Sequence, residues 1–361
     1  MNIDQEALRG VVEKVMADLG RTVPPADPVP VKVADRAPLA TPAPAPAEKE
    51  CACRSATGNG QGGHGIFGCV SSAANAAHDA FLQLKSLGLE GRSRVIEIVK
   101  GICSANTESW GAFELNETRI GRLDHKIAKL EIMNKVPGVE WLRPYALSGD
   151  DGITLEEYAP FGVVGAILPV THSVPTLTGN VINMVAAGNA VVFNPHPGGA
   201  RSAVMAAREY NKAIERELGI ENLICVIENP TLETFEKISK HELIAIMAVT
   251  GGPAVVKAAM QSGKRSICAG PGNPVVVVDE TADLDRAARS IVEGGAFDNN
   301  LLCIGEKAVF VVRSVYREFL ESMQRAGAGR LNNQQLERLS KAAFTYREED
   351  GGCSHAVVNR D

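Results

Sequence analysis

The sequence lacks the features that would place it in a membrane or on nucleic acid. Across its 361 residues, no apolar run reaches the roughly 18 residues that a membrane-spanning helix needs. No basic stretch followed by an apolar one stands at the N-terminus, so a secretion signal is also missing. The 37 basic and 43 acidic side chains are intermixed, which leaves a net charge of −6 and no basic stripe. We therefore expect no membrane partner and no nucleic-acid partner, and we expect a bacterial-type cytosol, or a body inside it, as the compartment.

Aromatic residues and paired cysteines are also scarce. Aromatics make up 5% of the chain while glycine reaches 35 residues, a balance that favours close packing of helices on a sheet over an aromatic-rich β-sandwich. The eight cysteines are scattered through a long chain, which favours reduced thiols over a disulfide framework. Apolar residues at 45% and charged residues at 22% are typical of globular proteins, so a mainly disordered chain is excluded.

The signal for a metal site is weak. Cys51 and Cys53 precede the glycine-rich TGNGQGGHG, which contains His64, and Cys69 follows it. A metal or cluster site needs three or four well-spaced soft ligands, and no repeated CxxC pair is present. A flexible loop with incidental thiols is therefore favoured, no metal is expected, and the purpose of the three cysteines stays open.

Residues 1–20 are predicted to form a short amphipathic helix on a tether. The helix would end at Gly20, and residues 21–65 are rich first in proline and alanine and then in glycine, as linkers are. Such a helix could pack back on its own domain or dock into a groove of another protein, and the long tether favours docking. One helical face carries the apolar side chains Leu8, Val11, Val12, Val15, Met16 and Leu19.

From about residue 66 onward, helical and strand patterns alternate. The strand patterns are continuous β-branched runs, which indicate parallel strands buried on both faces. The sequence therefore predicts an α/β fold with a Rossmann-like, doubly wound sheet. Strands are expected at 161–170, 189–195, 223–228, 244–251 and 274–280, and helices at 71–87, 92–136, 176–187, 200–218, 232–240 and 253–261.

Three segments could carry chemistry, although the usual GxGxxG fingerprint of a dinucleotide site is absent. Thr250-Gly251-Gly252-Pro253 joins a strand to a helix, and free N–H groups at such a turn can bind a diphosphate. FDNNLLCIGEK (297–307) places Cys303 after an Asn-rich turn, although a free cysteine is most often a small buried hydrophobe. CAGPGNPVVVVDE (268–280) is a Gly/Pro bend that leads into a strand.

Taken together and in this order, these segments resemble the aldehyde dehydrogenase superfamily. PVTHSVPTLTGNVINMVAAGNAVVFNPHP (169–197) is similar to its first cofactor-contacting segment, and AVTGGPAVVKAAM (248–260) to its phosphate-side turn and helix. ICAGPGNPVVVVDETADLD (267–285) resembles its domain-linking strand, and FDNNLLC (297–303) its nucleophile loop. The resemblance is closest to the CoA-acylating propionaldehyde and acetaldehyde dehydrogenases of bacterial microcompartments, which also carry a tethered amphipathic helix at the N-terminus.

The resemblance implies a domain plan. Residues 66–280 would form an NAD-binding domain, and residues 281–361 the start of a second, catalytic α/β lobe that is incomplete, since the family continues well beyond this point. Whether the chain is a fragment or a naturally curtailed form stays open. Residues 1–20 would be an encapsulation peptide that binds a shell protein and places the chain in the microcompartment lumen. A full-length chain would form a homo-oligomer.

The resemblance also assigns the chemistry. Cys303 would be the nucleophile that adds to an aldehyde and, after hydride transfer to NAD, carries a thioester. Hydrolytic members activate water with a Glu, and Cys268 stands at that position, with no carboxylate beside it at 267–270. The thioester would therefore pass its acyl group to the thiol of coenzyme A, with propionaldehyde as the first expected substrate and acetaldehyde as the second. A hydrolytic or phosphorylating enzyme, or a non-catalytic cargo or scaffold protein, are the alternatives.

The remaining site residues are carried over position by position. His172 stands about where the family has its oxyanion-stabilising Asn, and its N–H could act with the Cys303 backbone N–H, although a structural histidine is nearly as well supported. NPHP (194–197) replaces the usual Lys-Pro-x-Glu pattern, so the preference for NAD over NADP rests on the family alone. The expected cofactor-binding residues are Pro169, Val170, Thr171, Asn194, His196, Thr250, Gly251, Gly252 and Gly270.

Overall fold

The computed structural model describes residues 63–270, 272–346 and 353–356. The chain divides into two units, residues 1–51 and residues 52–361, and the account below concerns the second. The predicted helix at 1–20, nearly all of the predicted linker at 21–65, and Cys51 and Cys53 lie outside the described residues.

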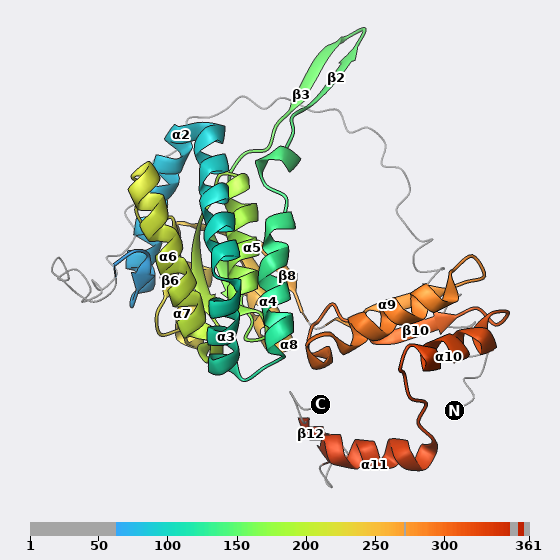
Figure 1. The fold of residues 1–361 in the computed structure, drawn as a ribbon. Helices are drawn as coiled ribbons and strands as arrows, with labels where there is room; N and C mark the ends of the chain where they lie inside the picture. The colour runs from blue at the N-terminus through green and yellow to red at the C-terminus, as the bar shows by residue number, and fades with distance from the viewer. Residues whose placement is uncertain (1–62, 271, 347–352, 357–361) are drawn as a thin grey trace. The chain divides into compact units, whose positions relative to one another are not determined.

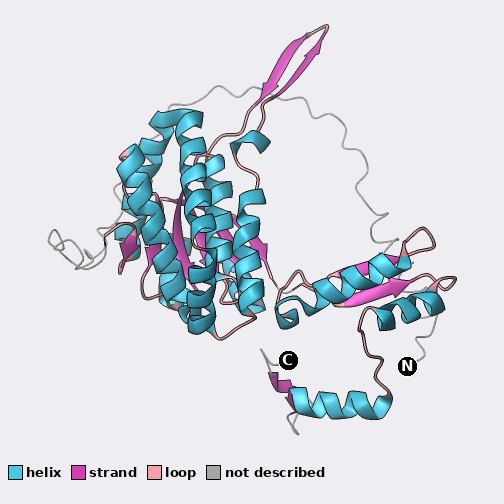
Figure 2. Cartoon of the chain, viewed as in Figure 1, coloured by secondary structure: helices cyan, strands magenta, loops and turns pink. Residues whose placement is uncertain are grey.

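A six-stranded sheet forms the centre of the described unit (Figures 1 and 2). Every neighbouring pair of its strands is parallel. Its strands, from one edge to the other, are β1 (Ile66–Phe67), β6 (Ile224–Ile227), β5 (Ala190–Pro195), β4 (Val163–Leu168), β7 (Ile244–Thr250) and β8 (Ser266–Ala269).

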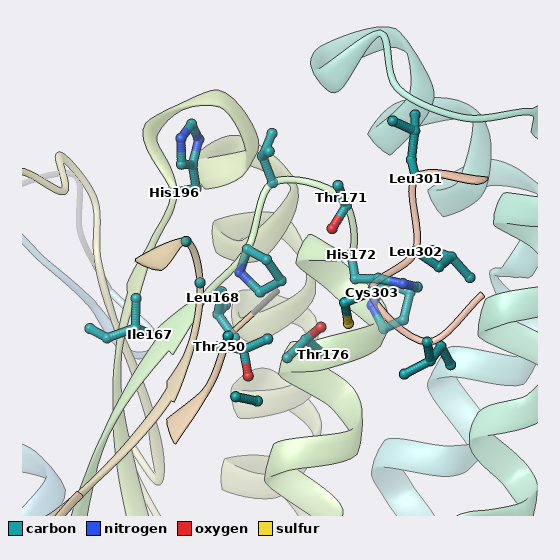
Figure 3. A pocket seen from close by; sticks show the side chains of 18 of the residues that line it. Ile167, Leu168, Thr171, His172, Thr176, His196, Thr250, Leu301, Leu302 and Cys303 are labelled. Carbon is teal, nitrogen blue, oxygen red and sulfur yellow. The ribbon is translucent and has the colours of Figure 1, made fainter. Parts of the chain in front are cut away.

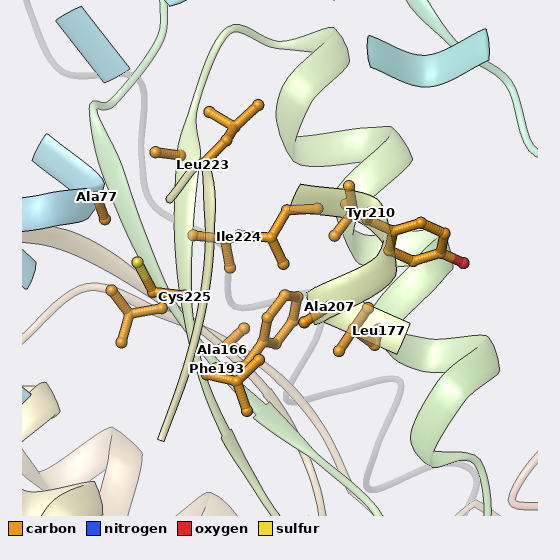
Figure 4. Close-up of a cluster of buried hydrophobic side chains, with 14 of the residues drawn as sticks. Ala77, Ala166, Leu177, Phe193, Ala207, Tyr210, Leu223, Ile224 and Cys225 are labelled. Atoms are coloured by element: carbon orange, nitrogen blue, oxygen red, sulfur yellow. The ribbon is translucent and has the colours of Figure 1, made fainter. Parts of the chain in front are cut away.

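Helices cover both faces of this sheet because its central strands are apolar on both sides. Every residue of β4 and β5 is buried, which requires a layer of side chains above and below them. Figure 4 shows Ile224 and Phe193 on the side of Tyr210, whereas Cys225 lies on the side of Ala77. The predicted doubly wound α/β fold is therefore confirmed. The connecting helices are α5 (Ser173–Ala186), α6 (Ala200–Leu218), α7 (Leu232–Lys240) and α8 (Pro253–Gln261).

The predicted helical region before the sheet is also confirmed: the break expected between 71–87 and 92–136 falls at Gly88, whereas the second expected helix is divided further than the sequence pattern indicated. The first helix, α2 (Val70–Ala105), is interrupted at Gly88, whose φ of 61° lies in the left-handed region that glycine adopts without a steric penalty. It is followed by α3 (Thr107–Thr118), α4 (Leu123–Glu131), η2 (Ile132–Lys135) and η3 (Val139–Trp141).

A two-stranded antiparallel hairpin follows, which the sequence pattern did not predict. It consists of β2 (Tyr145–Gly149) and β3 (Gly152–Glu156), and Figure 1 shows it extending away from the sheet. Every residue of both strands is exposed, including Leu147, Ile153 and Leu155. An exposed apolar hairpin is a surface on which another chain can pack.

One predicted strand belongs to a different sheet from the one expected. The segment 274–280 was expected to close the main sheet, and this was wrong: β9 (Val275–Val278) pairs in parallel with β10 (Ala308–Val311) in a sheet of its own. The edge of the main sheet is instead β8, and the predicted division into domains at residue 280 stays a prediction. Val278 packs with Ala288, Ile291 and Phe319 from α9 (Leu284–Ala296) and α10 (Tyr316–Arg325), which form a small core of their own.

The last described elements are α11 (Asn333–Ala343), β11 (Phe344–Tyr346) and β12 (Cys353–Ala356), of which the two strands pair antiparallel. Asn332 caps α11 by accepting a hydrogen bond from the backbone N–H of Gln335, whose side chain accepts one in return. None of the helices in the described ranges is both long and apolar enough to span a membrane.

Candidate active site

A cavity of about 1230 Å³ lies at the carboxyl ends of β4, β5 and β7. The chain runs from β4 outward to β5 and β6, and then returns to place β7 on the other side of β4. The turns that follow β4 and β7 therefore leave the sheet in opposite directions and open a crevice between them. Such a switch point is where open parallel sheets bind their ligands. The cavity also exceeds the usual 300–1,000 Å³ of a small-molecule pocket, which leaves room for a dinucleotide.

All the residues predicted for the site line this one cavity, although they come from four separate segments of the sequence. Figure 3 shows Cys303, His172 and Thr176 in the same part of it. The structure thus brings the predicted residues together, and the role of each stays a prediction. The lining includes Pro169, Val170, Thr171, His172, Asn194, His196, Thr250, Gly251, Gly252, Gly270 and Cys303.

The loop that carries Cys303 begins with three consecutive left-handed residues. Asp298, Asn299 and Asn300, within η5 (Phe297–Asn300), have φ values of 52°, 56° and 58°. Asn and Asp adopt this conformation more readily than other non-glycine residues, which explains the DNN in the sequence. The loop then buries Leu302 and leaves Cys303 exposed at the cavity.

Hydrogen bonds from polar side chains fix both ends of this loop. The Asn300 side-chain amide donates to the carbonyl oxygens of Gly295 and Glu306, and so closes the loop on itself. The Lys307 ammonium donates to the carbonyl oxygens of Leu302 and Gly305, at 2.9 and 3.1 Å. The Cys303 position is therefore held by contacts on both sides of it.

The segment after β8 also approaches the nucleophile loop closely. A Cβ atom on Gly272 would collide with the carbonyl oxygen of Cys303. Only glycine allows the two backbones to lie this close together. Gly272 of the GPGNP bend therefore allows the contact with the Cys303 loop.

His172 lies at the N-terminal end of α5, where it is the N-cap residue, and it is half-buried. Burial lowers the pKa of its imidazole from 6.5 to about 3, with further contributions from the positive charges of Lys129 and Lys126. The imidazole is therefore neutral at physiological pH and offers one N–H donor. A neutral donor can stabilise a developing oxyanion without titrating in the working pH range.

Four buried charged side chains lie behind the site, and the sequence pattern indicated none of them. Lys126 pairs with Glu114 at 2.7 Å and Lys129 with Asp298 at 2.6 Å. Each of the four residues is at most 6% exposed. Burial and the neighbouring Lys126 lower the pKa of Lys129. The available signal was the spacing of the two lysines, which at i and i+3 share one face of α4.

Two of the predicted cofactor-binding residues also have local structural roles. The Asn194 side-chain oxygen accepts a 2.6 Å hydrogen bond from the hydroxyl of Thr234 in α7. The Nδ1 atom of His196 accepts one from the backbone N–H of Gly198 at 3.0 Å, which caps η4 (Pro197–Gly199). Both residues still line the cavity.

The turn from β7 to α8 has the geometry of an anion site. Gly252 is the N-cap of α8 and Pro253 its first residue, so the N–H groups of the first turn lack partners within the helix. A Cβ atom on Gly252 would have no described neighbour within 4 Å, so there is open space beside its backbone. A diphosphate could approach the helix end through this space.

Carboxylates are rare around the cavity. Glu306 is the one acidic side chain among the described residues that line it. Cys268 lies on β8, half-buried, and is not part of the lining. Within the described ranges, no cluster of three or more His, Cys, Asp or Glu side chains could hold a metal ion. This finding does not extend to Cys51 and Cys53, which lie outside those ranges.

Comparison with known proteins gives a consistent set of relatives. The sequence profile of the aldehyde dehydrogenase family matches residues 67–337. Over 278 residues the chain is 41% identical to the CoA-propanoylating propanal dehydrogenase of Citrobacter freundii, covering 77% of this chain and 60% of that protein. The chain thus spans about three fifths of the length of this relative, and 58% and 63% of the propanal and acetaldehyde dehydrogenases of Salmonella typhimurium.

The solved structures that the chain resembles include enzymes of the same kind. A propionaldehyde dehydrogenase from the fucose utilisation bacterial microcompartment of Clostridium phytofermentans is 38% identical, with a TM-score of 0.75. That match covers 82% of this chain and 68% of the other. A propionaldehyde dehydrogenase of Rhodopseudomonas palustris with bound propionyl-CoA is 36% identical, with a TM-score of 0.73, covering 81% of this chain and 65% of the other.

Proposed function

Because this chain belongs to the aldehyde dehydrogenase family, we propose that it carries the nucleophile and the cofactor crevice of an enzyme that oxidises a short aldehyde to an acyl-CoA. The observation that carries the proposal is the position of Cys303, which is exposed in the cavity at the switch point of the sheet. A free thiol at that place lies in the crevice that would hold a dinucleotide, in the same part of the cavity as the neutral imidazole of His172 (Figure 3).

The first step uses only residues of this chain. The Cys303 thiol loses its proton to solvent water, and the thiolate adds to the aldehyde carbon to form the anion of a thiohemiacetal. The negative charge that develops on the aldehyde oxygen is stabilised by the N–H of His172 and the backbone N–H of Cys303. His172 needs no change of protonation for this role, since its pKa of about 3 keeps it neutral.

The crevice fits a nicotinamide dinucleotide, and we propose NAD. The turn after β7 offers the end of α8 and the open space at Gly252 to the diphosphate, while Pro169, Val170 and Thr171 line the opposite wall. Bound NAD would supply the hydride acceptor that the oxidation of the aldehyde requires. The choice of NAD over NADP rests on the family, because NPHP (194–197) carries no acidic side chain that could select a ribose hydroxyl.

The acceptor of the acyl group is proposed to be the thiol of coenzyme A. The Citrobacter relative is named as CoA-propanoylating, and the Rhodopseudomonas structure holds propionyl-CoA. At the position where the hydrolytic members have their base, this chain has Cys268, which carries no carboxylate. Hydrolysis is a second candidate for one reason: Glu306, three residues after Cys303, lines the same cavity and could activate water.

Propionaldehyde is the first proposed substrate and acetaldehyde the second. Part of the cavity wall is formed by aliphatic side chains, which can accept a short alkyl group. The relatives of Citrobacter and Clostridium are named for propanal and propionaldehyde. The aliphatic wall consists of Ile132, Met133, Leu301, Leu302 and Ile304.

We also propose a location and two macromolecular partners. The amphipathic pattern of residues 1–20 supports docking on a shell protein, and thus a place in the lumen of a bacterial microcompartment within the cytoplasm. The exposed hairpin of β2 and β3 supports a homo-oligomer, in which a second copy would cover Leu147, Ile153 and Leu155. Deletion of residues 1–20 tests the docking, because it should remove encapsulation and leave the catalytic residues in place.

The central experiment measures NADH formation from propionaldehyde and NAD, with and without coenzyme A. We expect turnover that requires coenzyme A and disappears in Cys303→Ala, while Cys69→Ala, which removes a half-buried thiol outside the cavity, retains it. Acid release without coenzyme A would favour hydrolysis, and its loss in Glu306→Gln would assign the base. A folded chain that shows no turnover, alone or extended beyond residue 361, would favour the cargo or scaffold alternative.

A further inference from the structure

The buried charges behind the cavity form one continuous network between the two loops that carry Cys303 and His172. It contains two lysines and two carboxylates, so its formal charge is zero: Glu114 from α3, Lys126 and Lys129 from α4, and Asp298 from η5. The side chains of Lys126 and Glu114 are each 1% exposed, and those of Lys129 and Asp298 are 7% and 0% exposed. Of the four, Lys129 reaches the cavity lining.

One side of the network holds the His172 segment. The ammonium groups of Lys126 and Lys129 donate to the carbonyl oxygen of Thr171, at 3.1 and 3.4 Å. Glu114 accepts a hydrogen bond from the backbone N–H of Val174 at 3.1 Å. The residues on both sides of His172 are therefore fixed by buried charged groups, and charge-assisted hydrogen bonds are the stronger kind.

The other side of the network holds the start of the nucleophile loop. Asp298 accepts hydrogen bonds from the ammonium of Lys129 at 2.6 Å and from the backbone N–H of Arg122 at 3.1 Å. Its own backbone N–H donates to Nδ1 of His125 at 2.8 Å. A Cβ atom on Gly121 would collide with the Asp298 carboxylate, so α4 and its preceding turn enclose this side chain closely.

Lys129 is the member that joins the two sides, because its ammonium bonds both Thr171 and Asp298. A buried ion pair is weak support for stability, since the cost of removing two charges from water offsets most of their attraction. The Lys129–Asp298 pair does, however, hold the backbone at Thr171 and the backbone at Asp298 in a fixed relative position. Misplacement of a reacting group by about 1 Å can lower a rate about 100-fold. The relative position of the segments that carry Cys303 and His172 is therefore important for the reaction.

We propose that Lys129 is a positioning residue for the reaction: through Asp298 and Thr171 it sets the nucleophile loop of Cys303 against His172. This inference rests on the proposed function for its kinetic consequence. The contacts themselves do not depend on the proposed function, because Lys129 bonds both loops whatever the substrate is.

The same network sets the electrostatics of His172. The positive charges of Lys129 and Lys126 lower its pKa and the negative charge of Asp298 raises it, while Glu114 balances Lys126. Replacing Lys129 by a neutral residue removes one lowering charge and leaves Asp298 unopposed. Both changes raise the pKa of His172, so the network adds to burial, the larger cause, in keeping the proposed oxyanion donor neutral.

The kinetic test compares four variants under the CoA-dependent assay. We expect Lys129→Met to lower kcat about 100-fold with KM for the aldehyde changed by less than about threefold, and Lys129→Arg to recover most of the loss. The double variant Lys129→Met with Asp298→Asn leaves no unpaired buried charge. It should regain the unfolding midpoint that the single variant loses, yet keep the low kcat. The control Lys212→Met loses an exposed ion pair to Glu209 and should retain kcat.

The double variant separates positioning from stability. If it regains both the unfolding midpoint and kcat to within about threefold of the unmodified chain, the network is structural only and the proposal is overturned. A second measurement does not depend on turnover: the pKa of His172 from histidine ¹³C NMR, assigned with His172→Asn. We expect Lys129→Met to raise it, because a lowering positive charge is removed. An unchanged pKa would overturn the electrostatic link, and absent turnover in the unmodified chain would contradict only the proposed function.

Discussion

The pH dependence of stability provides a sharp test of the environment of His172. Its pKa is 6.5 in the unfolded chain and about 3 in the folded one, because burial and the charges of Lys129 and Lys126 disfavour the imidazolium. Between these values the unfolded chain binds a proton that the folded chain does not. The stability that depends on this group is therefore fully present above pH 6.5, and it is lost as the pH falls towards 3.

The size of the effect follows from the two pKa values. At about pH 8 the imidazole is neutral in both states, so it contributes almost nothing to the pH dependence. At about pH 5 the unfolded state is stabilised by protonation by about 2 kcal/mol, while the folded state is almost unprotonated. Acidification over this range should therefore reduce the free energy of unfolding by about 2 kcal/mol through His172 alone.

The perturbation that isolates this contribution is His172→Asn. Asparagine keeps a side-chain N–H and is a favourable N-cap for α5, but it does not titrate. Urea unfolding of both chains at about pH 8 measures the pH-independent cost of the substitution. At about pH 5 the variant should have lost about 2 kcal/mol less than the unmodified chain. Equal losses in the two chains would refute the assigned burial and charge effects on His172.

Three further substitutions test the packing beside Cys303, the packing inside the sheet and the role of Glu306. Gly272→Ala places a Cβ against the carbonyl of Cys303 and should lower kcat by about 10-fold or more with a smaller effect on KM, measured in the CoA-dependent assay. Gly165→Ala forces a Cβ within 2.6 Å of the Met247 sulfur in the centre of the sheet, and should lower the free energy of unfolding by about 1–3 kcal/mol in urea titrations. Glu306→Gln should leave the acyl-CoA yield per aldehyde unchanged if coenzyme A is the acceptor, as product analysis by chromatography would show.

The parts of the fold that could be predicted are those that a short stretch of sequence determines by itself. β4 is a continuous apolar run and β5 begins with one, and the pattern of these residues indicates burial on both faces. The placement of β9 could not be obtained in this way, because its VVVV pattern suits any buried strand. Its partner β10 is chosen by long-range packing against α9 and α10, which local periodicity does not record.

The residues of the candidate site also fall into two groups, those that local motifs predict and those that depend on long-range pairing. Cys303, His172 and the turn at Thr250 stand in motifs that resemble a known family, and the structure places them in one cavity. The buried charges were missed because charged residues are almost never fully buried, so Lys129 and Asp298 suggest solvent-exposed positions when taken singly. Their burial depends on pairing between residues far apart in the chain, and a single sequence does not show this.

The strand order has a consequence for how the cavity is assembled during folding. In β4, Val163 pairs with Ala190 of β5, a near neighbour in the sequence, and also with Ile244 of β7, which is much more distant. Contacts of long sequence separation form more slowly, because a longer loop must close before they are made. The crevice exists only after β7 has joined β4. The chain should therefore build most of its sheet before it can bind any ligand, and ligand binding should stabilise the pairing that forms last.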